Sequence, residues 1–90
     1  MKNIETTDDV GRYLEGAKII RMYTANGIEE GGLTIVFDKG GDVGIYIMGY
    51  TELGDWVEHF DHAGILVTGP WGYVDDQVNN VREDNGFERI

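Results

Sequence analysis

The clearest pattern in the chain is a pair of apolar runs on either side of a glycine turn. Residues 33–38 and 43–48 are rich in Ile, Val, Leu and aromatic side chains, and Lys39-Gly40-Gly41-Asp42 separates them. Two glycines at the central positions suit the positive backbone angles of a tight hairpin turn. The pattern therefore predicts two antiparallel strands joined at Gly40 and Gly41.

This turn also predicts how the two strands pair. The residues expected to face each other are Leu33 and Met48, Thr34 and Ile47, Ile35 and Tyr46, Val36 and Ile45, and Phe37 and Gly44. Both faces of this hairpin are apolar, whereas a sheet with one solvated face alternates apolar and polar residues. We therefore expect strands that are covered on both sides, curled on themselves, or buried between subunits. Gly44 opposite Phe37 is expected to allow a bend or a close approach.

Shorter patterns predict two further strands. Residues 18–24 are rich in Ile, Met and Tyr and end at Asn26-Gly27, which is typical of a strand followed by a turn. Residues 65–68 form a short apolar run that ends at Gly69-Pro70. Between them, residues 28–32 are acidic and glycine-rich and are expected to form a loop.

Helical spacing appears in three places. Thr7 is a suitable cap for a short helix, because acidic residues follow it in the first turn. In residues 50–62 the apolar positions are Leu53, Trp56, Val57 and Phe60, at spacings that predict a helix with Trp56 in the core. Gly54 disfavours this helix by about 1 kcal/mol, so an extended segment is the alternative. A last short helix is expected around Val78, followed by a loose tail over residues 85–90.

Together these elements predict one α+β domain over residues 1–90. Its sheet is small, antiparallel, meander-like and four-stranded, and one to three short helices pack on it. Ninety residues with 41% hydrophobic composition are enough for one modest core.

The charge of the chain limits its partners. The formal net charge is −10, and no Lys or Arg occurs between Gly40 and Val81. This window holds seven acids: Asp42, Glu52, Asp55, Glu58, Asp61, Asp75 and Asp76. Nucleic acids and anionic lipids attract Lys and Arg, so neither is expected as a direct ligand, and the expected partner is a protein with a basic surface. Cysteine is absent, and no leader or apolar run of membrane-spanning length is present, which favours the cytoplasm.

Two groups of side chains are candidates for binding. On a helix over residues 50–62, the acids Glu52, Asp55, Glu58 and Asp61 would form a carboxylate-rich face for the basic partner. The same helix would bring Asp55, Glu58, His59 and His62 to one side, where they could hold a divalent metal as an alternative. A solvated helix face that merely contains both histidines is the competing interpretation.

The loop after Pro70 is a further candidate for binding, in addition to these two groups. Trp71 and Tyr73 are aromatic residues of the kind that anchor interfaces, although folding back onto the sheet would account for Trp71 equally well. Asp75 and Asp76 follow this loop and extend the acidic surface.

No catalytic motif is present. Serine and cysteine are both absent, and the glycines lack the spacing of phosphate-binding loops. The sequence therefore favours a non-enzymatic protein-binding module without a cofactor. In its most concrete form it inhibits a nucleic-acid-binding protein, by analogy of size and charge with anti-CRISPR and anti-restriction proteins of mobile elements. The alternatives are a small metal-binding or ligand-binding domain, with a hydrolytic function included, centred on His59 and His62, and a structural domain that forms a homodimer through the sheet.

Overall fold

A computed structural model describes residues 7–24, 28–51, 54, 56–69 and 76–90 of the chain. Its elements, in chain order, are α1 (Thr7–Tyr13), β1 (Lys18–Tyr23), β2 (Ile28–Lys39), β3 (Asp42–Thr51), β4 (Trp56–His62), β5 (Ile65–Gly69) and α2 (Asp76–Asp84). The described part of the chain is therefore α+β, as the sequence predicts.

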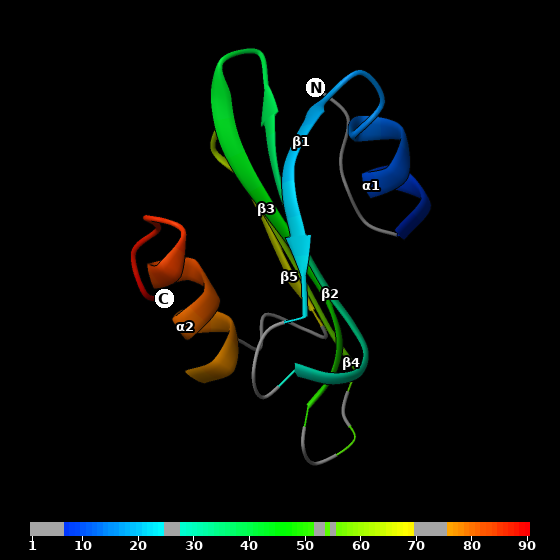
Figure 1. Ribbon diagram of the computed structural model, residues 1–90, viewed down its shortest axis with the longest axis vertical. Helices are drawn as coiled ribbons and strands as arrows, with labels where there is room; N and C mark the ends of the chain where they lie inside the picture. Colours follow the sequence, from blue (N-terminus) through cyan, green and yellow to red (C-terminus); the bar gives the residue numbers. More distant parts are fainter. Residues whose placement is uncertain (1–6, 25–27, 52–53, 55, 70–75) are drawn as a thin grey trace.

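The five strands form one antiparallel sheet in the order β1-β2-β3-β4-β5 (Figure 1). Each strand pairs with its neighbour in sequence, so the sheet is a meander, as predicted. The prediction of four strands was wrong, because the segment predicted as a helix over residues 50–62 contributes β4.

The hairpin of β2 and β3 has the predicted turn and the predicted pairing. Gly40 and Gly41 both have positive φ angles, 67° and 89°, which a two-residue turn of this kind requires. All five predicted pairs are present, from Leu33 with Met48 to Phe37 with Gly44. Both strands run further than predicted: β2 begins at Ile28, so residues 28–32 belong to a strand and not to a loop, with a register shift between Glu29 and Leu33.

The segment predicted as a helix is a strand for a physical reason. Val57 and Phe60 are both buried, but they lie on opposite faces of the sheet. A strand that is buried on both faces loses its alternating pattern, and its apolar residues then imitate helical spacing. The chain leaves β4 through Ala63 and Gly64, whose φ angles of 51° and 85° close a second tight turn before β5.

Each face of the sheet carries one helix (Figure 1). On one face Val78 and Val81 of α2 pack on a cluster that includes Val36, Ile45, Ile47 and Val57. On the other face Val10 of α1 packs with Phe37, Tyr46 and Phe60. The hairpin is thus covered on both sides by the chain itself, which is the first of the three arrangements expected from its apolar faces.

The C-terminal segment, which the sequence predicts as a loose tail, has definite partners. The amide of Asn79 on α2 donates to the backbone oxygen of Ile90 at 3.1 Å and accepts from its N–H at 2.7 Å. Nε of Arg82 donates to the backbone oxygen of Glu88 at 2.7 Å. These bonds hold the segment against α2.

Candidate protein-binding face

Glu58 and Asp61, two of the four carboxylates predicted to share one helix face, lie on opposite faces of the sheet. Glu58 and Asp61 lie on β4, where residues three apart project to opposite faces. Asp61 lies on the α2 face and accepts from Nη1 of Arg82 at 2.7 Å. Glu58 lies on the α1 face, where its Oε2 accepts from the hydroxyl of Tyr46. A continuous acidic ridge through these two residues is therefore not formed.

The other predicted partner-binding residues have different outcomes. Asp76 begins α2, is well exposed, and forms an ion pair with Arg89 at 3.1 Å. The remaining five lie outside the described residues: Glu52, Asp55, Trp71, Tyr73 and Asp75.

His59 belongs to a buried network under α2. Its Nε2 accepts from Nη1 of Arg82 at 2.8 Å, so the ring proton lies on Nδ1, which is buried and has no partner in the described part of the chain. The pKa of His59 is lowered to about 4, mainly by burial and also by the positive charge of Arg82, while the negative charge of Asp61 opposes the shift. His59 is therefore neutral near pH 7 and acts as an acceptor for Arg82.

His62 belongs to a separate network under α1. Its Nε2 lies 3.0 Å from the backbone oxygen of Lys39 and 3.1 Å from that of Asp42, and it donates to these acceptors. Its Nδ1 accepts from the hydroxyl of Tyr13 at 2.6 Å. Both ring nitrogens are engaged, and the residue ties α1 to the turn between β2 and β3.

The two histidines therefore lie on opposite faces of the sheet. The metal site was predicted from a helix over residues 50–62 that would place them on one side, but both histidines belong to the strand β4. Among residues 7–24, 28–51, 54, 56–69 and 76–90, no group of three or more His, Asp or Glu side chains is placed to hold a metal ion.

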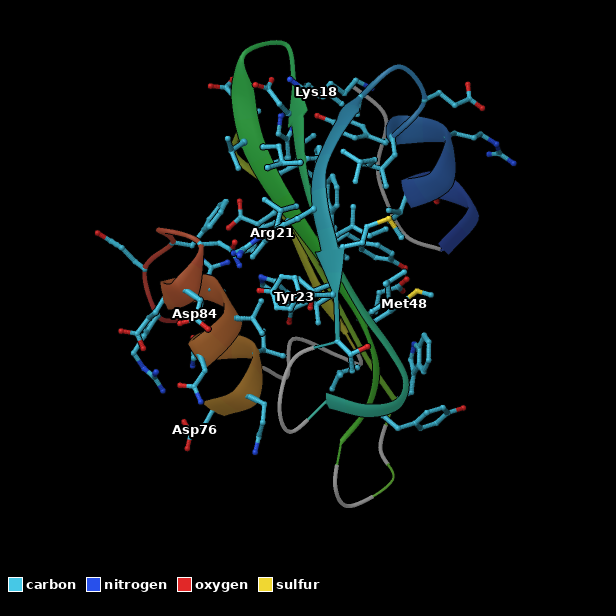
Figure 2. All side chains as sticks on the ribbon, in the orientation of Figure 1. Lys18, Arg21, Tyr23, Met48, Asp76 and Asp84 are labelled. Carbon is cyan, nitrogen blue, oxygen red and sulfur yellow. The ribbon has the colours of Figure 1, made fainter. Side chains whose placement is uncertain are left out.

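An exposed apolar surface occurs instead on the α1 face of the sheet, beyond the end of α1. We call it the open face, and its residues are Met22, Leu33, Met48, Tyr50, Trp56 and Glu58. Figure 2 shows Met48 on the same side of the sheet as α1, with Asp76 and Asp84 of α2 on the other side. The open face thus lies on the opposite side of the sheet from α2.

The aromatic pair Tyr50 and Trp56 forms one end of the open face. The two residues are cross-strand partners on β3 and β4, and their rings meet edge to face with centroids 5.2 Å apart. Tyr50 is 46% exposed and Trp56 is 38% exposed, so the prediction of Trp56 as a core residue was wrong. Large, rigid, partly exposed aromatic side chains are the residues that most often dominate binding energy at protein interfaces.

Two methionines extend this surface toward β1. Met22 is 54% exposed and Met48 is half-buried between the aromatic pair and the core under α1. Methionine side chains are flexible and polarizable, which lets a surface adapt to a bound partner. Glu58 is the only acidic or basic side chain among the residues that define the open face, and it pairs across the strands with Met48.

Several basic residues are occupied within the chain. Three arginines each form an ion pair with a carboxylate of this chain: Arg12, Arg82 and Arg89. Nζ of Lys39 donates to the backbone oxygen of Tyr13 and lies 4.1 Å from the centre of the Tyr13 ring. The three arginines therefore neutralise carboxylates of the chain itself. The net charge of −10, which already counts all seven basic residues, favours a partner of opposite charge.

Sequence reasoning missed the open face because it placed Trp56 on the apolar stripe of a helix. The signal that could have found it is the pair Tyr50 and Trp56, which flank the segment containing Gly54 and are both suited to cross-strand aromatic contact. Gly54 has a positive φ of 84°, a backbone conformation that glycine adopts without strain.

None of the helices in the described residues is long and apolar enough to cross a membrane. Comparisons with models of protein families, with curated proteins and with solved structures found no match to this chain.

Proposed function

We propose that this chain is a small acidic protein-binding module that acts by binding and not by catalysis, and that its partner is a protein with a basic surface. The observation that carries the proposal is the open face, an apolar and aromatic surface on a chain with a net charge of −10. Exposed aromatic residues supply the contact area, and complementary charge accelerates the encounter.

Nucleic-acid-binding proteins are the partners that best fit this charge, because their functional surfaces are basic. The most concrete form of the proposal is an inhibitor that covers such a surface, as anti-CRISPR and anti-restriction proteins do. In this form the open face holds the partner, and the excess of carboxylates on the chain attracts the partner's Lys and Arg residues.

The proposal is tested by affinity capture from a lysate of the source cells at low and at moderate salt. The baits are the unchanged protein, Trp56→Ala, and Leu66→Ala as a matched control. Leu66 is 50% exposed and lies on the α2 face of the sheet, since it pairs with Asp61. Each bait is first shown to be folded by circular dichroism.

We expect the unchanged protein and Leu66→Ala to capture the same basic protein. Trp56→Ala should weaken this complex by at least about tenfold, as loss of an aromatic hot spot does. Higher salt should slow association of all three baits. A captured protein that binds Trp56→Ala and the unchanged protein equally would rule out the open face as the binding surface.

A further inference from the structure

The uncovered part of the sheet is large compared with the helix that shares its face. The ten residues of β3 extend about 33 Å, whereas the seven residues of α1 extend about 10 Å. Within the described residues, α1 packs around Phe37 and Phe60, near one end of the sheet, and Tyr50 and Trp56 at the other end remain exposed. An apolar part of a sheet face that no helix covers is stably buried when a further helix packs on it.

The edges of the sheet are poorly suited to accept a strand from a partner. The edge strand β1 carries Lys18 and Arg21, and its register shifts between Ile19 and Arg21. Charged side chains and bulges of this kind protect edge strands from pairing with other chains. The opposite edge strand, β5, has only five residues. A partner is therefore expected on the face of the sheet and not at its edge.

The dimensions of the open face suit a helix. From Met22 on β1 to Trp56 on β4 there are three strand spacings, or about 14 Å. Three turns of helix are about 16 Å long, and a helix with its side chains is about 10 Å wide. One helix of three turns would thus cover the open face.

Charge determines the kind of helix. The one carboxylate among the residues that define the open face is Glu58, and the chain as a whole carries ten excess negative charges. A second copy of this chain would bring like charges together, which opposes self-association. A helix with an apolar stripe and flanking Lys or Arg residues would match both the apolar surface and the net negative charge of the chain.

From this geometry and charge we infer that the open face binds a basic amphipathic helix of the partner protein. The inference rests on the proposed function and specifies the structure of the segment that is bound. The apolar stripe of the helix packs on Met48, Tyr50 and Trp56, and its basic residues lie toward Glu58.

Two synthetic peptides of identical composition test this inference. Both contain only Leu and Lys in about 15 residues; one has Leu at the helical spacing of three and four, and the other alternates Leu and Lys as in a strand. Each is titrated into the protein, and binding is followed by the backbone amide and indole signals in nuclear magnetic resonance spectra. Trp56→Ala and the control Leu66→Ala are titrated in the same way.

We expect the helical peptide to bind more tightly than the alternating peptide, with signal changes that map to the open face. Trp56→Ala should weaken this binding by at least about tenfold, and Leu66→Ala should leave it unchanged. Tighter binding of the alternating peptide, or changes that map to β1, β5 or the α2 face, would overturn the inference. Sedimentation that shows a dimer of the unchanged protein and a monomer of Trp56→Ala would assign the open face to a second copy instead.

Failure of this inference is distinguishable from failure of the proposed function. If the peptides bind without preference while capture of the cellular partner still depends on Trp56, the protein-binding function stands and the bound segment is not a helix. If capture is also independent of Trp56, both are wrong.

Discussion

The ring of Phe37 packs directly on the backbone of Gly44, its cross-strand partner. A Cβ atom placed at position 44 would lie 2.5 Å from Cζ of Phe37, 2.8 Å from Cβ of His62 and 2.9 Å from the backbone oxygen of Asp61. These neighbours belong to β2 and β4, so no single side chain could move to make room.

We therefore expect Gly44→Ala to lower the free energy of unfolding by about 2 kcal/mol or more, because overpacked cores are strained by this amount. Gly11→Ala is the matched control. Gly11 lies in α1 with no atom within 4 Å of the added Cβ, so this change should raise stability by up to about 1 kcal/mol. Urea unfolding of the three proteins measures both effects, and equal stability of Gly44→Ala and the unchanged protein would contradict the close packing described here.

The hairpin containing this pair was predictable in detail because a local signal determines it. Gly40 and Gly41 fix the turn, and the turn fixes every pair up to Leu33 and Met48. Such information lies within a few residues of sequence. The position of α1 and α2 on opposite faces was not predictable in the same way, because it depends on which apolar residues meet across the whole chain.

The candidate site was not predictable because β4 is buried on both faces. His59 and His62 are both buried in hydrogen-bonded networks, one under each helix, although polar residues are usually exposed. The sequence alone places them on the polar side of a predicted helix. Only the pairing of β4 with β3 reveals that Trp56 is exposed and that Glu58 and Asp61 lie on opposite faces.

Arg82 connects β4, α2 and the C-terminal segment, and its loss should be costly. Arg82→Met would leave Asp61, His59 and the backbone oxygen of Glu88 without their donor. We expect the free energy of unfolding to fall by about 3 kcal/mol or more, as when one partner of a buried ion pair is removed. Thermal or urea unfolding measures the change.

The control for Arg82 is an exposed ion pair. Arg12 lies 3.6 Å from Asp9 and its side chain is 63% exposed, so Arg12→Met should change stability by less than about 0.5 kcal/mol. Similar effects of the two substitutions would show that Arg82 contributes no more than a surface residue.

The depressed pKa of His59 predicts a loss of stability in acid. The folded protein keeps His59 neutral down to a pKa of about 4, while the unfolded chain takes up the proton near its ordinary pKa of 6.5. Between these two values the unfolded state binds more protons, so this residue's contribution to stability falls as the pH is lowered from about 6.5 toward 4. When this contribution of His59 is lost completely, the free energy of unfolding falls by about 3 kcal/mol.

His59→Gln isolates this contribution, because glutamine retains an acceptor for Arg82 and does not titrate. We expect the unfolding free energy of the unchanged protein, measured relative to that of His59→Gln, to decrease as the pH falls from 7 to about 4.5. A difference that stays constant over this range would show that His59 does not titrate differently in the folded and unfolded states.

The excess of negative charge predicts that moderate salt stabilises the protein. At a net charge of −10, carboxylates repel one another across the compact fold, and salt shortens the range of this repulsion from about 30 Å at 0.01 M to about 8 Å at 0.15 M. We expect Tm to rise by about 4 to 8 °C over this range, which corresponds to about 1 kcal/mol for a domain of this size. Sodium and potassium chloride should act alike, and Asp84→Lys on the exposed side of α2 should reduce the dependence on salt. A fall in Tm with added salt would instead show that attraction within ion pairs outweighs the repulsion between the acids.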